Sequence, residues 1–274
     1  MRQAISSEPS IVVVLYASNI IIFVYRPYFA TLHCRRTFSI CNAPSTLFPY
    51  KSPDDLFNPH SRPFSSGSAH FRSIKFKMTN DTKPFIVRFY GPERAKDSKG
   101  RTLNSILQFD NGALEYHHDY IQVLFPLPER SPINPEAPII TKAVRDLFAE
   151  NEDLRERLFA AFKRMADFYA FDLTGSKDDS KFSPKAKNFK RLASNSWLTS
   201  MDHNHLRITR IIRCLRILGL GPVAKGFHEA LKQQEEGRVS RRSLMYWQRA
   251  AERPLHLPPD ESNDGATGIV WLKE

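Results

Sequence analysis

The chain has 274 residues, of which 41% are hydrophobic, enough for one large or two small domains with a buried core. Its three cysteines exclude a disulfide framework and match no zinc-ligand spacing, so a reduced intracellular environment is expected. The net charge is +11, but residues 1–78 supply +6 of it through nine basic and three acidic side chains. The mild remaining excess suits solubility as well as it suits binding a polyanion.

Residues 1–78 are predicted to be a largely disordered leader, with a Pro- and Ser-rich stretch over 42–70 that shows no period. Residues 11–25 are mostly apolar, but as a helix they would reach about 22 Å, short of a hydrocarbon core of about 30 Å. Three interpretations stay open: a mitochondrial transit peptide, a short membrane anchor, or translation that starts at Met78. A membrane contact is expected only through 11–25, and a start at Met78 predicts a soluble intracellular protein.

The N-terminal half of the body predicts short elements joined by turns. Phe85–Tyr90 is a short extended or helical piece, and Leu103 lies in a short helix that Asp110-Asn111-Gly112 is expected to end. Residues 113–125 place their apolar side chains on one continuous stripe of a single helix, which Pro126 stops. A Pro-rich connection over 126–140 is expected to lie as an ordered loop on the core.

Longer helices are predicted in the C-terminal half of the body. Thr141 and Asn151 are N-cap candidates, and Asn151 precedes a helix whose apolar side chains recur at a period of 3.6 through Tyr169. Residues 172–187 predict a polar loop. Further helices are expected over about 184–194, from a cap at Asp202 to about 218, over 222–235 and over 240–252, followed by a tail at 253–274. The fold class is therefore all-α, with six to eight helices in a single compact domain over about 84–252.

Two histidine-containing motifs could carry chemistry. His117 and His118 would point about 100° apart on one helix and cannot chelate an ion together, so packed, hydrogen-bonded roles are favoured. Asp202-His-Asn-His205, beside Arg207, either caps its helix or holds a carboxylate or phosphate at the helix N-terminus, and capping is favoured. An enzyme would need one pocket that collects Asp202, His203, His205 and His118. No nucleophile elbow, phosphate loop or catalytic carboxylate pair is present, so neither catalysis, a cofactor nor a metal is expected.

Four arginines follow one another at every third position of the predicted helix over 202–218. They step about 60° around the helix and spread over half of it, whereas a groove contact would cluster them. A solvated face that pairs with acids is favoured over RNA binding, and no aromatic side chains are interleaved for base stacking. The arginines are Arg207, Arg210, Arg213 and Arg216.

Three blocks of sequence carry a resemblance to a known family. They cover 88–140, 154–171, and Trp197 with 202–221, and include HDYIQ (118–122), LFPLPE (124–129), FYAF (168–171) and HNHLRITRI (203–211). The chain resembles the opioid growth factor receptor conserved-domain family, in a short form without the C-terminal repeats of animal members. The resemblance implies an all-α domain. In animal members that domain belongs to a receptor for methionine-enkephalin that restrains proliferation and is associated with the nucleus and its envelope.

A non-catalytic, receptor-like binding domain is therefore the predicted function, with a peptide or a protein as its partner. For a pentapeptide, His205, Arg207 and Arg210 would hold the carboxylate. Tyr116, Tyr120 and Trp197 would contact the aromatic ring. The alternative is a protein-interaction or RNA-associated module that uses the helix over 202–218, although nucleic acid is the disfavoured partner. Nuclear or membrane association follows from the resemblance alone.

Overall fold

The computed structural model describes residues 83–131, 134–174, 176–178, 182–187 and 189–273, and the backbone of two strands near the N-terminus. The chain divides into two compact units, Met1–Lys75 and Phe76–Glu274. In the first unit, β1 (Ser10–Tyr16) and β2 (Asn19–Tyr25) pair antiparallel, with Ser10 opposite Tyr25. The apolar run over 11–25 thus forms two strands, as its Val and Ile residues favour. The stretch over 42–70 lies outside the described residues.

The second unit is mostly helical, as predicted, but the described residues form ten α-helices instead of six to eight helices, and the tail adds a short 3-10 helix, η2 (Val270–Leu272). The α-helices are α1 (Phe85–Tyr90), α2 (Leu103–Leu107), α3 (Asn111–Tyr116), α4 (Tyr120–Leu124), α5 (Lys142–Glu150), α6 (Glu152–Phe168), α7 (Phe189–Ala193), α8 (His203–Ile217), α9 (Gly221–Gln234) and α10 (Arg241–Glu252). No helix of the described part is both long and apolar enough to cross a membrane.

The predicted single helix over 113–125 is wrong, because the chain leaves the helical conformation at His117. The side chain of Asp110 accepts a hydrogen bond from the backbone N–H of Ala113 at 2.7 Å, so the Asp110–Gly112 turn begins α3 instead of ending α2. The break lets Leu114 and Tyr120 both enter the core, where the Tyr120 hydroxyl donates to the carbonyl of Leu114 at 3.1 Å. The predicted stop before Pro126 is confirmed, since α4 ends at Leu124.

The predicted N-caps of the longer helices are confirmed. Thr141, Asn151 and Asp202 each accept a hydrogen bond from a backbone N–H in the first turn of α5, α6 and α8 respectively. Helix α6 buries the predicted apolar stripe, which includes Leu158 and Phe162. These caps are local features, so the sequence around each one is sufficient to indicate it.

The predicted polar loop over 172–187 contains a short antiparallel hairpin of β3 (Phe171–Thr174) and β4 (Ser183–Ala186), and the helix expected over 184–194 shrinks to α7. Ala170, at φ 66°, turns the chain out of α6 and into β3. Phe171 and Phe182 are buried and attach the hairpin to the core. The all-α class therefore holds with one small sheet added.

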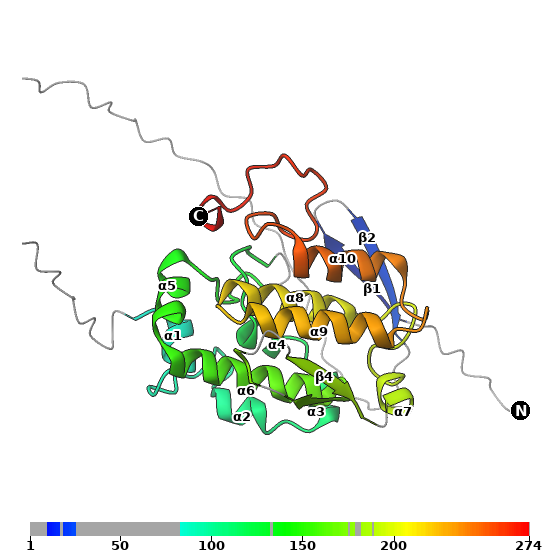
Figure 1. Ribbon diagram of the computed structural model, residues 1–274, viewed down its shortest axis with the longest axis horizontal. Coiled ribbons are helices and arrows are strands. Elements are labelled where there is room, and N and C mark those ends of the chain that lie inside the picture. The colour runs from blue at the N-terminus through cyan, green and yellow to red at the C-terminus, as the bar shows by residue number, and fades with distance from the viewer. Residues whose placement is uncertain are drawn as a thin grey trace, which may run out of the picture. The chain divides into compact units, whose positions relative to one another are not determined.

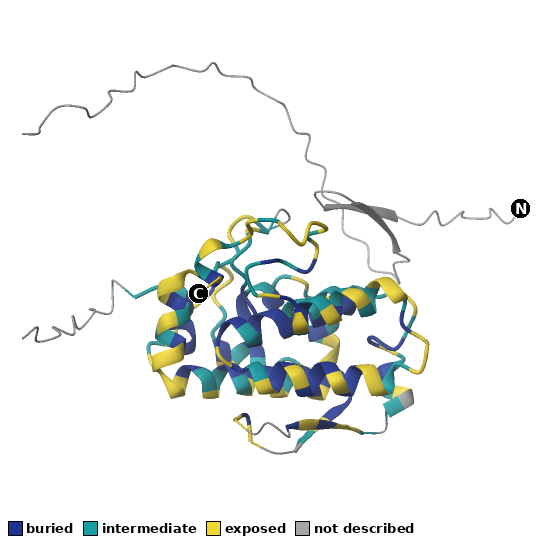
Figure 2. Cartoon of the chain, turned by 45° about the horizontal axis from the view of Figure 1, so that its top comes forward, coloured by how far each residue is buried: buried dark blue, intermediate teal, exposed yellow. Residues whose placement is uncertain are grey.

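Helix α8 lies at the centre of the helical unit, with α9 beside it and α10 packed against both (Figure 1). Helix α6 packs against α1, α2 and α5 and continues into the hairpin, whose β4 contacts α9. Ten of the fifteen residues of α8 are buried. Figure 2 shows the buried residues concentrated on the facing sides of the helices. A helix this deeply enclosed has little surface to offer a partner.

Candidate functional site

Arg207 extends from α8 to the C-terminal end of α3. Its guanidinium donates to the carbonyls of Leu114 at 2.9 Å and His117 at 2.8 Å, and its side chain is only 4% exposed. Carbonyls in the last turn of a helix have no partner within the helix, and the dipole makes that end favourable for a cation. Arg207 therefore acts as a C-terminal cap supplied by another helix.

Other arginines of α8 make similar contacts. Arg210 donates to the carbonyl of Phe125 at the end of α4, at 3.1 Å. Arg216 donates to Ala250 at 2.8 Å and Arg253 at 2.9 Å, at the end of α10. Arg213 is buried and donates to Leu257, and it also pairs with Glu129. The predicted solvated arginine face is therefore wrong, because these side chains turn inward to satisfy backbone carbonyls.

Helix α6 supplies the same kind of cap to three further short helices. Arg155 donates to Phe148 and Ala149 in the last turn of α5. Arg157 donates to Gly91 after α1, and Arg164 donates to Phe109 after α2. The two long helices thus provide cations at the C-terminal ends of the short helices that pack on them.

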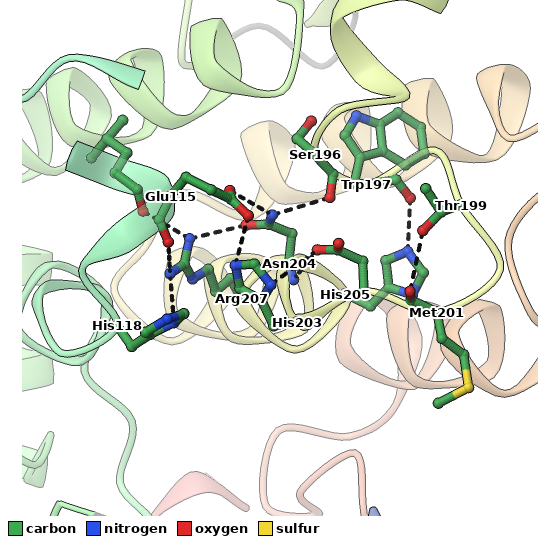
Figure 3. Close-up of polar contacts among 12 residues, drawn as sticks. Glu115, His118, Ser196, Trp197, Thr199, Met201, His203, Asn204, His205 and Arg207 are labelled. Atoms are coloured by element: carbon green, nitrogen blue, oxygen red, sulfur yellow. Dashed lines mark hydrogen bonds and ion pairs between the residues drawn. The ribbon is translucent and has the colours of Figure 1, made fainter. Parts of the chain in front are cut away.

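A polar cluster surrounds the N-terminal end of α8 (Figure 3). The amide nitrogen of Asn204 donates to Glu115 Oε2 and to the carbonyl of Ser196, both at 3.1 Å, and its oxygen accepts from Arg207 at 3.1 Å. The buried ring of His205 has Nε2 2.7 Å from the carbonyl of Trp197 and Nδ1 2.8 Å from Ser243 Oγ. Because a carbonyl can only accept, Nε2 carries the proton and Nδ1 accepts.

Two further histidines border this cluster. His203 Nε2 lies 3.2 Å from Glu115 Oε1, and its Nδ1 lies 3.4 Å from Asp202 Oδ1. The rings of His118 and His203 meet edge to face, 5.1 Å apart. Burial first, and the charge of Arg207 second, lower the pKa of His118 and of His203, and burial also lowers the pKa of His205. The neutral form of all three imidazoles is therefore favoured in the folded protein.

The six predicted ligand contacts occupy different environments. His205 and Trp197 are joined by their hydrogen bond, and Arg207 lies over the ring of Tyr120 at 5.6 Å. Trp197 and Tyr120 are fully buried, and the Trp197 indole donates to the carbonyl of Tyr169 at 3.0 Å. Arg210 is half-buried and donates to the carbonyl of Phe125. Tyr116, by contrast, is 73% exposed.

Glu115 is the member of the cluster that sequence reasoning missed. It lies 89 positions before Asn204, and the sequence around it has no motif that would indicate a functional site. Together with Asp202 and His203 it offers three possible metal-ligand atoms, all within 4.8 Å of one another. His117 and His118 lie after α3 and not within one helix, but their side chains point to different places, as predicted. His117 packs on Phe109, whereas His118 faces His203.

Comparisons with known proteins agree on one group of relatives. The model of the opioid growth factor receptor (OGFr) conserved region matches residues 79–254. The opioid growth factor receptor of Rattus norvegicus is 36% identical over 169 residues, covering 59% of this chain and 28% of that protein. The Homo sapiens receptor is 34% identical over 174 residues, covering 59% of this chain and 24% of that protein. Opioid growth factor receptor-like protein 1 of Mus musculus is 29% identical over 186 residues, covering 65% and 38% respectively.

The chain therefore spans between about a quarter and two fifths of the length of these relatives. No solved structure gives a significant match. The similarity is to the helical unit, since the matched region begins at residue 79 and ends at residue 254.

Proposed function

Because this chain belongs to the opioid growth factor receptor conserved-region family, we propose that its helical domain is a non-catalytic, receptor-like binding module. The observation that carries the proposal is the family match over residues 79–254, which covers most of the helical unit. The curated relatives that share this region are named receptors. Association with the nucleus or with a membrane belongs to the same proposal.

The ligand we propose is a short opioid-type peptide that carries an aromatic ring. Tyr116 supports this choice, because it is a large side chain left 73% exposed at the end of α3. Its ring already meets that of His117 edge to face at 5.4 Å, which forms a small aromatic surface. A second aromatic ring placed there would gain buried apolar area at small entropic cost, since the backbone below is fixed.

Two of the other predicted contacts fix the backbone next to this surface. Arg207 and Tyr120 bond to the carbonyl of Leu114, and Arg207 also bonds to that of His117, so both sides of Tyr116 are fixed. Trp197 and His205 hold the loop before α8. We therefore propose Tyr116 as the residue that touches the ligand and Arg207 as a positioning residue.

Isothermal titration calorimetry with methionine-enkephalin tests the proposal on the full chain. We expect a saturable heat, and we expect Tyr116→Ala to weaken binding at least tenfold while leaving the melting temperature nearly unchanged. Val270→Ala is the matched control, because Val270 is also strongly exposed but lies in the tail. An absence of heat at high micromolar peptide, or equal affinity in Tyr116→Ala, would overturn the peptide proposal.

The arginine-bearing helix offers less support for an RNA-associated module. Arg207 and Arg213 are buried, and all four arginines of α8 donate to backbone carbonyls. A phosphate contact would have to break these bonds and uncover the carbonyls. The peptide-binding proposal needs no such rearrangement.

A further inference from the structure

Three side chains with metal-binding chemistry meet where α3 approaches the start of α8. Glu115 lies in the last turn of α3, Asp202 is the N-cap of α8, and His203 is the first residue of that helix. One ligand atom of each lies within 4.8 Å of the other two, a grouping that occurs once among the described residues. Figure 3 shows His203 and Glu115 pointing toward each other from the two segments.

Each carboxylate accepts a hydrogen bond from Asn204 that fixes its position. Glu115 Oε2 accepts from the Asn204 side chain at 3.1 Å, while Oε1 faces His203 Nε2 at 3.2 Å. Asp202 Oδ1 accepts from the backbone N–H of Asn204 at 2.7 Å and lies 3.4 Å from His203 Nδ1, so the imidazole would turn to present one nitrogen to both carboxylates when an ion binds. Hydrogen bonds of this kind orient the ligands of metal sites and raise their affinity.

His203 Nε2 is without a hydrogen-bond partner among the described residues. The atom is buried and makes no hydrogen bond, although Glu115 Oε1 is only 3.2 Å away. The distance allows a hydrogen bond, so the direction between the two groups is what prevents one. A buried polar atom without a partner is unfavourable, and an ion bound by both atoms would remove that penalty.

We propose that Glu115, Asp202 and His203 bind one divalent transition-metal ion of the zinc class. Two ligands about 2.0–2.2 Å from a tetrahedral Zn²⁺ lie about 3.3 Å apart, close to the distance between Nε2 and Oε1. One imidazole with two carboxylates suits zinc better than calcium or magnesium, which prefer oxygen ligands alone. The ring of His118 lies next to that of His203 and completes the surroundings of the three ligands.

The local charge permits such an ion. The two carboxylates offset the ion's charge, while Arg207 adds one positive charge nearby through Asn204 and His118. A histidine binds a metal ion through its neutral form, so binding should weaken as the pH falls. An ion held here would connect α3 to α8 directly, so binding should also stabilise the fold.

The test is calorimetric titration of the full chain with ZnCl₂ at pH 7.5, in a Cys34→Ser, Cys41→Ser background that removes the leader thiols. We expect one ion per chain and a melting temperature that rises with Zn²⁺. His203→Ala and Glu115→Gln should each weaken binding at least tenfold and abolish that rise. His256→Ala is the matched control, because His256 is a half-buried histidine of the tail, and it should bind as the parent does.

Two results would overturn the site: no saturable binding, or equal Zn²⁺ affinity in the parent and in His203→Ala. Circular dichroism of each variant shows whether it is folded. If Glu115→Gln fails to fold, His203→Ala decides the question, because that side chain is partly exposed. The outcome does not depend on the peptide proposal, since no peptide is present.

Discussion

Arg207 illustrates how much of the domain's positive charge lies inside it. The side chain bonds to Leu114, Glu115 and His117 through their carbonyls and also to the side chains of Asn204 and His118. A charge buried this far must be hydrogen-bonded on all sides, and here neutral acceptors at a helix C-terminus take the place of a carboxylate.

Replacing Arg207 with Met should destabilise the domain by about 2–4 kcal/mol. The new side chain fills similar space but leaves the His117 carbonyl without a donor and the Leu114 carbonyl with only the Tyr120 hydroxyl, and each lost hydrogen bond costs about 1–3 kcal/mol. Urea unfolding measures the loss. Arg242→Met is the control, because Arg242 is exposed on α10, and its change should stay within about 0.5 kcal/mol. Equal effects of the two substitutions would show that Arg207 is no cap.

The histidines make stability depend on pH. Burial lowers the folded-state pKa of His118, His203 and His205 below the unfolded value of about 6.5, so the unfolded chain binds protons first as the pH falls. This contribution is complete above that pH and is lost as the pH drops further. The free energy of unfolding, measured in urea, should therefore decrease from pH 7.5 to 5.5. His205→Gln, which cannot titrate, should show a shallower decrease, and an equal slope would contradict the assignment.

At the scale of single residues, local chemistry was predictable and distant pairing was not. Asp202 was identified as a cap because a carboxylate before a helix meets free N–H groups within a few residues. Glu115 could not be assigned to the same cluster, since its contact with Asn204 depends on how α3 and α8 pack.

Short helices need outside support in this fold. Helices α2, α3 and α4 have five or six residues each, far below the length of about 12–15 residues at which an isolated helix becomes marginally stable. Periodicity over 113–125 predicted one helix because the apolar spacing fits one. In the structure that helix is interrupted at His117, and Arg207 donates a hydrogen bond to the His117 carbonyl. The sequence pattern contains no sign of that cap.

Gly226 provides a test at the level of element packing. A Cβ at this position on α9 would meet the Phe182 carbonyl oxygen at 2.1 Å, whereas a Cβ at Gly221 of the same helix would meet nothing within 4 Å. Alanine normally stabilises a helix by about 1 kcal/mol relative to glycine. We expect Gly226→Ala to lower the melting temperature nonetheless, because the hairpin must shift away, and Gly221→Ala to leave it unchanged or higher. A stable Gly226→Ala protein would mean that the hairpin does not pack closely on α9.

The whole helical unit is organised around α6 and α8. Their period of 3.6 made both helices and their buried faces predictable, whereas the hairpin over 171–186 was hidden in a polar stretch without clear alternation. The hydrogen-bond partners of the arginines could not be predicted either. Their spacing shows on which side of the helix each side chain begins, but not whether a backbone carbonyl lies within its reach. Length and periodicity therefore predicted the scaffold, and tertiary packing determined the rest.

Hydrogen-exchange mass spectrometry of Arg164→Met tests most directly whether arginines from the long helices hold the short ones. Arg164 donates to Phe109 and Asn111, between α2 and α3, and makes a surface pair with Asp167. We predict faster exchange over residues 103–116 and unchanged exchange in α9 and α10. Unchanged exchange over 103–116, or an equal increase throughout the helical unit, would contradict the account.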